Sequence, residues 1–455
     1  MSTSRRVGWG CALGMALGAA ASWARYLATG TLRIDTGSAA FILSSLALGA
    51  GLAVACTCAL RLQRDARWLE PRALLASSLV AHLCAFPALA LTSSDLFSYL
   101  AYGRLQLAGL NPHLSGPRAL ASDPVTALVA PRWLDARSNY GPLADLASRL
   151  AARAGETFGS PVWVAGFSFK LLMLLSSLGV VLLAWGHARR RGADGADAFA
   201  LVALSPLLAW EVSGQGHNDG LVVLALMGFV WAASAGRELA ASLALAAGVA
   251  VKIAVAPLLA LYLLFVARRS PTRAAALGLA AAALGAVAFL PYWQGTAPLR
   301  EWALGLGHYR AIHAHSLADL LALALARTSP ETQAMTQRAC ALGSTLLFAG
   351  LFARAALRAT ELPRLFGDAL GLYLAWCLTT PWFQPWYATW LLPLGAADPD
   401  PRRRRLIALY GVISVVQWAV PLDPVTTVAG NAFIAWQWLR PRKPVAKDVP
   451  AASAA

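Results

Sequence analysis

Apolar runs of about 15 to 25 residues recur along the whole chain, and each is bounded by arginine, proline, glycine or aspartate. As helices, runs of this length match the roughly 30 Å hydrocarbon core of a bilayer. Composition agrees, because 58% of the 455 residues are hydrophobic and only 13% are charged. Strand-like alternation is absent, which argues against an outer-membrane barrel. We therefore expect an all-α, polytopic integral membrane protein.

The runs predict about fourteen transmembrane helices. They lie at 7–24, 37–62, 73–92, 161–187, 196–212, 219–235, 238–251, 253–268, 273–292, 338–357, 366–381, 385–398, 405–421 and 425–440. The first resembles a signal peptide, but we expect a retained span because another apolar run follows at once. Residues 1–440 then form one polytopic membrane domain, with a long outer loop at 93–160 and a second outer loop at 293–337. Residues 441–455 are expected to be a disordered cytoplasmic tail.

Arginine clusters between the runs set the expected orientation, because basic loops stay in the cytoplasm. With Arg5 and Arg6 inside, the clusters near 61–72, 189–191, 268–273, 354–364, 402–405 and 440–447 also lie inside. Both termini of this cell (inner) membrane protein are then cytoplasmic, and the active site faces outside, toward the periplasm. This requires that segment 316–326 does not cross the membrane. The net charge of +16 reflects these determinants and not binding to nucleic acid.

A carboxylate stands at the outer end of a span in "LTSSDLFSYLAYGR". Tyr99 and Tyr102 follow Asp95 by four and seven positions, on one face of a predicted amphipathic helix lying at the membrane interface. Asp95 could be a helix N-cap, as Ser93 or Ser94 also could. Alternatively, desolvation could raise its pKa and make it a proton acceptor.

Several polar residues crowd the outer end of two consecutive spans in "WEVSGQGHNDG". The candidates for binding sugar or acceptor here are Glu211, Gln215, His217, Asn218 and Asp219. A charged side chain in the bilayer costs about 2.5–3.5 kcal/mol on insertion scales. Helix capping explains one such residue but not the whole group, so a functional role is favoured.

Lys252 in "GVAVKIAVAP" is the only charge in a long apolar hairpin. It could snorkel to the interface, or hold a lipid phosphate as a point charge. Tyr140 lies in a Tyr-Gly-Pro turn that is either a rigid corner or part of a pocket. The aromatic corner "WFQPWY" contributes Gln384, Trp386 and Tyr387 as an interfacial belt or a surface on which sugars stack.

Metal and nucleotide chemistry find little support. His313 and its neighbours have no carboxylate in register, so a hydrogen-bonding or general-base role for His313 is favoured over a zinc site. The six cysteines all fall in apolar stretches and predict neither zinc nor a disulfide. P-loop, dinucleotide and Ser-His-Asp patterns are absent, as are repeated broken helices typical of transporters.

The motifs "SSDLFSYLAYGRLQLAGLNPH", "NYGPL", "GHNDGLVV", "VAVKIAVAP" and "QPWYATWLLPL" follow one another between residues 91 and 400. Together they resemble the polyprenol-phosphate-mannose-dependent α-1,6-mannosyltransferases, membrane glycosyltransferases of the C-type (GT-C) fold. The resemblance implies transfer of a hexose, mannose in that family, from a polyprenyl-phosphate carrier to a glycan or glycolipid acceptor on the outer face. It further implies inversion in one displacement, with no metal and no cofactor beyond the donor substrate.

Carried over to this sequence, the resemblance makes Asp95 the base that deprotonates the acceptor hydroxyl. Lys252 would hold the carrier phosphate with help from Arg104 or Arg310. Tyr99 and Tyr140 would shape the pocket around the sugar. A single acid, Asp95, follows Ser93 and Ser94 where many enzymes of this fold carry an acidic pair, so Asp219 is implied as an assisting acid.

Two other classes remain open from the sequence. A flippase or exporter of a lipid-linked glycan would need polar groups along a path through the bundle, whereas Lys170 stands alone there. A non-catalytic subunit of envelope assembly explains the topology but not Asp95 together with Lys252. The expected partners are the polyprenyl-phosphate sugar, the acceptor and membrane lipids.

Overall fold

The structure, a computed structural model, describes residues 3–34, 38–64, 70–90, 92–192, 195–308, 329–419 and 423–440. Regular structure within these ranges is helical, and the one β-bridge in them, Gln294 with Thr296, is isolated. The expectation of an all-α fold is therefore confirmed. The predictions for Arg310, His313, segment 316–326 and the tail 441–455 fall outside the described residues.

The helices follow the apolar runs closely. Their bounds are α1 Thr3–Thr29, α2 Ala39–Arg64, α3 Pro71–Ala85, α4 Asp95–Leu107, α5 Pro142–Thr157, α6 Trp163–Arg190, α7 Gly195–Ala203, the π-helix η6 Leu208–Gly214, α8 Asp219–Ser234, α9 Glu238–Val251, the short η7 Ile253–Val255, α10 Ala256–Ala267, α11 Pro271–Phe289, η8 Leu290–Tyr292, α12 Ala297–His308, α14 Pro330–Arg358, α15 Leu362–Thr379, η9 Pro385–Trp390, α16 Leu391–Ala397, α17 Pro401–Ala419 and α18 Asp423–Leu439. Proline at the first or second position starts many of them, including α3, α5, α10 and α11.

Four of the described helices are long and apolar enough to cross a membrane: α2, α6, α11 with its η8 extension, and α14. The bent pair of α7 and η6, with 43° between its halves, would be a fifth. The apolar helices α3, α8, α9 and η7 with α10 are shorter. Several long apolar helices in one chain indicate a multi-pass membrane protein.

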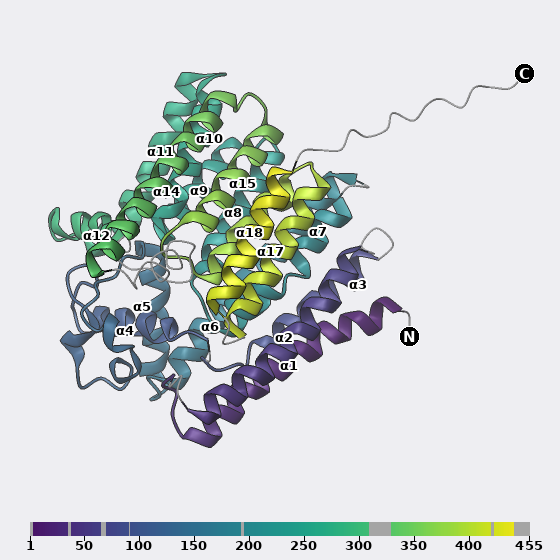
Figure 1. Cartoon of the computed structure of the whole chain (residues 1–455). Coiled ribbons are helices and arrows are strands. Elements are labelled where there is room, and N and C mark those ends of the chain that lie inside the picture. The colour runs from purple at the N-terminus through teal and green to yellow at the C-terminus, as the bar shows by residue number, and fades with distance from the viewer. Residues whose placement is uncertain are drawn as a thin grey trace, which may run out of the picture.

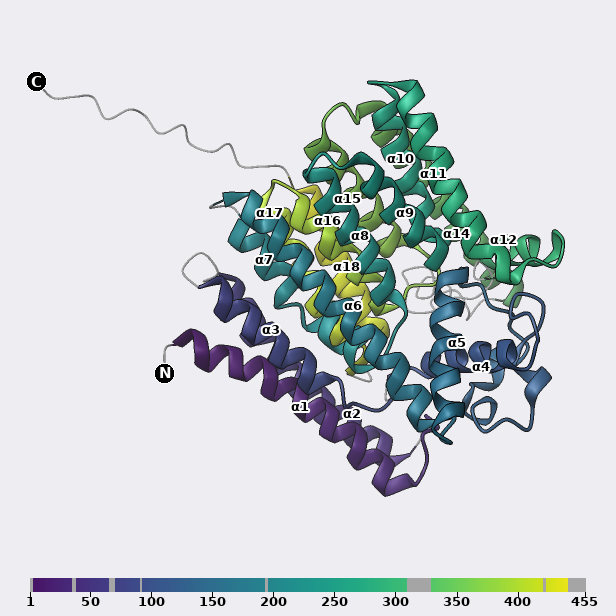
Figure 2. The ribbon, with the colours of Figure 1, turned by 180° about the vertical axis from the view of Figure 1, so that it is seen from behind.

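The helices form a bundle with two flanking groups (Figure 1). Helices α1, α2 and α3 pack together along one side, and both views place them beside the central helices (Figures 1 and 2). Helix α6 packs on α8, α8 on α9 and α9 on α11, while α14 packs on α15 and α17 on α18. Helices α4 and α5 lie together at one end of the bundle, with α12 nearby.

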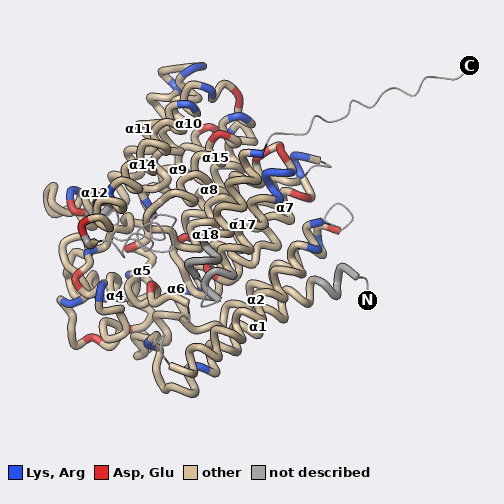
Figure 3. The backbone as a smooth tube through the Cα atoms, viewed as in Figure 1, with Lys and Arg blue, Asp and Glu red and all other residues tan. Residues whose placement is uncertain are grey.

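Charged residues gather at the two ends of this bundle. Figure 3 shows Lys and Arg at the tips of α2, α10, α11 and α17, away from α4 and α5. Acidic residues lie among the basic ones both at these tips and around α4, α5 and α12. The basic tips are the short connectors that the arginine clusters predicted to lie on one side of the membrane.

Helix α4 is buried, contrary to the prediction of an amphipathic helix at the interface. Nine of its 13 residues are buried, because α5 and α6 pack against it. Gly103 permits this packing, since a Cβ at this position would overlap the backbone carbonyl of Ser148 in α5. The sequence showed the face carrying the two tyrosines but not the second layer that covers it.

The helical structure is interrupted where α9 ends and α10 begins, and this interruption is called the break at Lys252. Lys252 is extended there (φ −146°, ψ 125°), and Pro257 starts α10. The turn before α5 lies against this break, because the amide of Gly141 donates to the carbonyl of Val251 at 2.8 Å. A Cβ at Gly141 would overlap the carbonyl of Ala250, so glycine is required for this approach.

Lys170 in α6 stabilises the chain where helix α3 ends. Its ammonium donates to the carbonyls of Phe86 and Ala88, just beyond the end of α3. Phe86 and Phe167 also lie near its charge, with ring centroids at 5.4 Å and 5.2 Å from Nζ. This lysine therefore satisfies carbonyls that the end of a helix leaves without partners.

The close approach at Gly103 predicts the effect of adding one methyl group. Gly103→Ala should destabilise the protein by about 1–3 kcal/mol, because α4 and α5 must move apart. Thermal unfolding of purified protein in detergent measures this. The control is Gly285→Ala in α11, where a Cβ meets open space and alanine favours the helix. Equal midpoints for the two variants would contradict the close packing.

Candidate active site

A cavity of about 1360 Å³ opens where α4 meets the ends of the central helices. Its walls come from segments far apart in the sequence: 92–95, 118–140, 252–257, 341–348 and 373–390. Most of these segments are ones that the arginine pattern predicted to share one face of the membrane. Of the predicted site residues, the cavity lining includes Asp95, Tyr140, Lys252, Gln384, Trp386 and Tyr387.

Asp95 is the first residue of α4 and does not cap it. Ser94 occupies the N-cap position without a side-chain bond, and Ser93 Oγ accepts the amide of Asp95 at 3.1 Å. The carboxylate is therefore available to the cavity, where 24% of the side chain is exposed. Burial raises the pKa of Asp95, while the nearby charge of Lys252 and the Ser93 hydroxyl oppose the rise. A carboxylate in this environment is a plausible proton acceptor.

Lys252 forms an ion pair with Asp219, so it does not snorkel to the interface. Nζ lies 2.6 Å from Asp219 Oδ2, and Trp390 Nε1 donates to Asp219 Oδ1 at 2.7 Å. Asp219 is fully buried, while 12% of the lysine side chain remains exposed. The rings of Tyr140 and Tyr387 each lie 5.4 Å from Nζ. Lys252 therefore lines the cavity, and Asp219 is its buried partner behind the cavity wall.

The polar group before α8 lies behind the cavity and not on its surface. Gln215 accepts the amide and hydroxyl of Thr92 and donates to the carbonyl of Leu89, which ties the segment before α4 in place. Asn218 is buried at the N-cap position of α8 without a capping bond. Glu211, His217 and Asp219 are likewise buried. Direct contact of these side chains with a sugar, as the sequence suggested, has no support in the cavity lining.

His217 links this buried group to the cavity. Its ring stacks on Trp386 with centroids 3.6 Å apart, Nδ1 lies 3.9 Å from Asp95 Oδ2, and Nε2 lies 3.3 Å from Glu211 Oε2. Burial lowers the pKa of His217 well below its ordinary value, and the charge of Lys252 adds to this. The imidazole is therefore neutral. Tyr99 is buried beside it, with its hydroxyl 3.5 Å from Nδ1.

Arg104 lies outside the cavity lining. It leaves the opposite part of α4 and pairs with Asp123 at 2.8 Å and with Glu156 at 2.7 Å. These partners come from the long loop and from α5, and the motif around Arg104 does not reveal them. We therefore do not retain Arg104 as a ligand for phosphate.

Part of the cavity lining was not predicted from the sequence: Arg33, Arg118, Arg132 and Trp133. Trp133 meets Trp382 edge to face, with centroids 6.0 Å apart, and Arg132 lies 5.2 Å from the ring of Trp133. Short 3₁₀ turns carry Arg118, Arg132 and Trp133. Such turns have no hydrophobic periodicity, so residue type is the only signal of them that a sequence carries.

Another wall of the cavity is a single helix thick. Ala341, Ser344 and Phe348 of α14 line the cavity. Leu342 and Leu346 on the same helix are 60% and 62% exposed. One helix therefore has the cavity on one side and the surroundings of the protein on the other.

A match to a protein-family model identifies the family of this chain. The model described as "Alpha-(1->6)-mannopyranosyltransferase, N-terminal domain" matches residues 7–268, which is more than half of the chain. The chain belongs to this family. The matched region contains Asp95, Asp219 and Lys252, whereas the aromatic corner at 379–390 lies beyond it.

Three relatives show the extent of the similarity. The chain is 29% identical over 354 residues to alpha-(1->6)-mannopyranosyltransferase A of Mycobacterium tuberculosis, covering 71% of the chain and 64% of that relative. It is 31% identical over 137 residues to a probable alpha-(1->6)-mannopyranosyltransferase of Mycolicibacterium smegmatis, covering 29% of the chain and 23% of the relative. Alpha-(1->6)-mannopyranosyltransferase B of Corynebacterium glutamicum is 30% identical over 146 residues, or 31% of the chain and 22% of the relative. No solved structure matches the chain.

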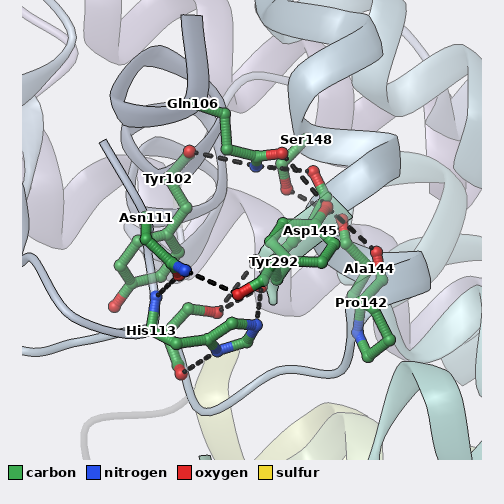
Figure 4. A network of polar contacts seen from close by, with 10 residues as sticks. Tyr102, Gln106, Asn111, His113, Pro142, Ala144, Asp145, Ser148 and Tyr292 are labelled. Atoms are coloured by element: carbon green, nitrogen blue, oxygen red, sulfur yellow. Dashed lines mark hydrogen bonds and ion pairs between the residues drawn. The ribbon is translucent and has the colours of Figure 1, made fainter. Parts of the chain in front are cut away.

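A buried polar network that includes His113, Asp145 and Tyr292 supports the segment before α5 (Figure 4). Ser138 donates to both oxygens of Asp145, at 2.8 Å and 3.0 Å. His113 Nδ1 lies 3.1 Å from the carbonyl of Ser138, and Nε2 lies 3.4 Å from Asp145 Oδ2. Asn111 donates to the carbonyl of Tyr292 at 2.8 Å. The network holds residues 138–141 in place. This segment includes Tyr140, and its Gly141 bonds to Val251, next to Lys252.

Ser138, His113 and Asp145 do not form a catalytic triad. The serine hydroxyl donates to the carboxylate and not to the imidazole, and all three side chains are buried. A triad needs the histidine between the two other groups and an exposed nucleophile. The arrangement is therefore a support for the loop. Among the described residues, no group of three or more His, Cys, Asp and Glu side chains is placed to hold a metal ion.

Burial favours the neutral forms of both Asp145 and His113. It raises the pKa of Asp145 well above its ordinary value and lowers that of His113. In a neutral imidazole ring, Nδ1 is the donor here because it faces the carbonyl of Ser138. Nε2 then lies 3.4 Å from Asp145 Oδ2 without a hydrogen bond.

The raised pKa of Asp145 predicts how stability changes with pH. An acid that holds its proton more tightly when folded loses stability as pH rises above its unfolded pKa, about 3.9. Asp145→Asn keeps the same donor and acceptor without titrating, so its melting temperature should fall less between pH 5 and pH 8 than that of the wild type. The control is Asp135→Asn, an exposed partner of Arg118. An unchanged pH dependence in Asp145→Asn would show that Asp145 is ionised in the folded protein.

Proposed function

We propose that this protein is a membrane mannosyltransferase that moves mannose from a polyprenyl-phosphate carrier to a hydroxyl of a glycan or glycolipid acceptor. One observation supports this most: a carboxylate, Asp95, and an ammonium, Lys252, line the same cavity. Transfer of a sugar from a phosphate needs a base for the nucleophile and a cation for the leaving group. Family membership and the names of the relatives add mannose as the sugar and an α-(1→6) linkage.

In the proposed reaction, Asp95 takes the proton of the acceptor hydroxyl as its oxygen attacks the anomeric carbon of the donor. The bond from that carbon to the phosphate oxygen breaks, and the phosphate leaves with the electron pair. Attack and departure on opposite faces invert the anomeric centre in one step. The proton on Asp95 is afterwards released to solvent, and the carrier phosphate leaves as the second product.

Lys252 is suited to binding the phosphate, because Asp219 fixes the position of its ammonium without using all of its N–H donors. An ammonium has three N–H donors, and Asp219 takes one of them at 2.6 Å. The rings of Tyr140 and Tyr387 limit the directions in which the chain can swing. In this proposal the lysine, and no resident metal or cofactor, neutralises the leaving phosphate.

The cavity lining offers chemically different groups for the two substrates. Ile253, Pro257 and the α14 residues Ala341 and Phe348 are apolar and suit the isoprenoid chain. The lining also includes Arg132, Trp133 and Trp382. Indole faces stack on sugar rings, and guanidinium groups bond hydroxyls, so we assign the acceptor to these residues.

The proposed topology keeps the fourteen spans of the sequence analysis, with both termini in the cytoplasm and the cavity open to the outer face. Each predicted span overlaps a helix or a pair of helices. The basic tips lie at the end of the bundle away from α4 and α5 (Figure 3), in agreement with the positive-inside rule. The transporter alternative is weaker, because the ammonium of Lys170 is engaged by the carbonyls of Phe86 and Ala88.

Removing the base tests the assignment of Asp95. Asp95→Asn should lower kcat by about 10²–10⁴-fold, because a general base contributes that much. The assay measures mannose transfer from polyprenyl-phosphate mannose to an oligomannoside by purified protein in detergent. Asp135→Asn, a change of the same type at an exposed residue, is the control. Transfer at the wild-type rate by Asp95→Asn would remove Asp95 from the mechanism.

Changing Lys252 tests the phosphate site. Lys252→Gln should raise the KM for the donor by about 10-fold or more, as expected for a lost charge-assisted hydrogen bond, and leave the acceptor KM nearly unchanged. The double variant Asp219→Asn, Lys252→Gln avoids an uncompensated buried carboxylate and should show the same donor defect in a well-folded protein. Arg273→Gln, at an exposed ion pair, is the control. An equal rise in both KM values would contradict the phosphate role.

A further inference from the structure

Glu211 is a buried acid that the proposed reaction does not use. It lies in the π-helix η6, is 1% exposed, and neither of its carboxyl oxygens has a hydrogen-bond partner within the described structure. His217 Nε2 lies 3.3 Å from its Oε2. A buried carboxylate without donors is costly, so this side chain calls for a role.

The backbone is built to bring His217 over Glu211. The amide of His217 donates to the carbonyl of Glu211 at 3.1 Å, so the chain folds back on the π-helix. Gly216 makes this reversal with φ +79°, a conformation that favours glycine. Trp386 then covers the ring at a centroid distance of 3.6 Å. The ring therefore has a fixed position, with one nitrogen toward Glu211 and the other toward the cavity.

The tautomer of His217 decides whether these contacts attract or repel. A neutral imidazole has one nitrogen that donates and one that accepts. If Glu211 were ionised, Nε2 would carry the proton, and the lone pair of Nδ1 would face the carboxylate of Asp95 at 3.9 Å. If Glu211 is neutral, its hydroxyl donates to Nε2, and Nδ1 carries a proton toward Asp95 and the Tyr99 hydroxyl.

The charges around the pair favour the neutral acid. Lys252, the nearby cation, already pairs with Asp219 at 2.6 Å. Asp95 carries the remaining charge and faces His217. An ionised Glu211 would add a second uncompensated anion to a buried cluster, which desolvation and repulsion both oppose.

We propose that Glu211 is a neutral hydrogen-bond donor that fixes the tautomer of His217, so that Nδ1–H points at Asp95 and holds that carboxylate ionised and oriented for the acceptor. This rests on the proposed function, because it assigns a role toward the proposed base. Glu211 and His217 are positioning residues, since neither lines the cavity. The N–H dipole directed at Asp95 from 3.9 Å favours the charged form of the carboxylate, which lowers its pKa and keeps it a base at lower pH.

Two substitutions at Glu211 separate a donor from an anion. Glu211→Met has similar length and no donor, and it should lower kcat about 10-fold or more, with both KM values nearly unchanged. The acid limb of kcat/KM should move to higher pH, because the Nδ1–H dipole no longer points at Asp95. Glu211→Gln, whose amide N–H can bond Nε2, should restore most of the rate and the wild-type limb. Glu361→Met, at an exposed residue, should behave as wild type.

Two different results would contradict the proposed role of Glu211. If Glu211→Gln lost as much activity as Glu211→Met, with a shifted limb, Glu211 would act as an anion and the proposal would be wrong. If both variants lowered the melting temperature without moving the limb, the role would be structural and the proposal would again be wrong.

A second measurement does not depend on activity. In protein labelled with ¹⁵N-histidine, the shifts of the two ring nitrogens of His217 report which one carries the proton. The protein has seven histidines, and comparison with His217→Gln assigns the signal. We expect the Nδ1–H tautomer, and an Nε2–H tautomer would overturn the inference. An inactive wild type that still shows Nδ1–H would contradict the proposed function alone.

Discussion

The arrangement around the cavity depends on the ion pair between Lys252 and Asp219. It joins the break before α10 to the first turn of α8 across 2.6 Å, and Trp390 of η9 completes the contact. Three separate parts of the chain thus meet at one buried charge pair. Breaking such a pair from one side leaves an uncompensated charge, so the break at residue 252 and the corner at 385–390 are held in place together.

Two buried acid–histidine pairs flank this ion pair at different depths. Asp145 with His113 supports the turn that carries Tyr140 and reaches Val251 through Gly141. Glu211 with His217 lies behind Asp95. In each case an acid faces one ring nitrogen while the other nitrogen faces an oxygen atom. Neutral pairs of this kind orient hydrogen-bond donors in a medium of low polarity. Burying them costs less free energy than burying ionised pairs.

Much of the fold could be predicted from the sequence, because apolar runs ended by proline, glycine and arginine determine helix positions directly. Asp95 and Lys252 could also be proposed, since a charge in an apolar context is conspicuous. Their partners could not. Asp219 is 33 positions from Lys252, and Arg104 finds Asp123 and Glu156 only after α4 and α5 have packed together.

The errors in the sequence interpretation have the same origin. The face of α4 seemed to lie at the interface because its covering layer, α5, comes from a later segment. The polar residues before α8 seemed to open to the cavity, but Trp386, almost 170 positions on, covers His217. Trp133 was overlooked because a short turn gives no periodic signal. Proximity in sequence identifies a cluster but not which of its members face the cavity.

Helix α14 has a consequence for how a lipid-borne substrate would be used. The cavity lies on one side of this helix and exposed leucines on the other, so in the proposed reaction one helix separates a phosphate headgroup in the site from the acyl chains around its hydrocarbon tail. Turnover would then follow the number of carrier molecules per unit area of the leaflet and not their concentration in bulk solution. Dilution of the carrier by added phospholipid would slow the reaction even at constant total amounts of enzyme and substrate.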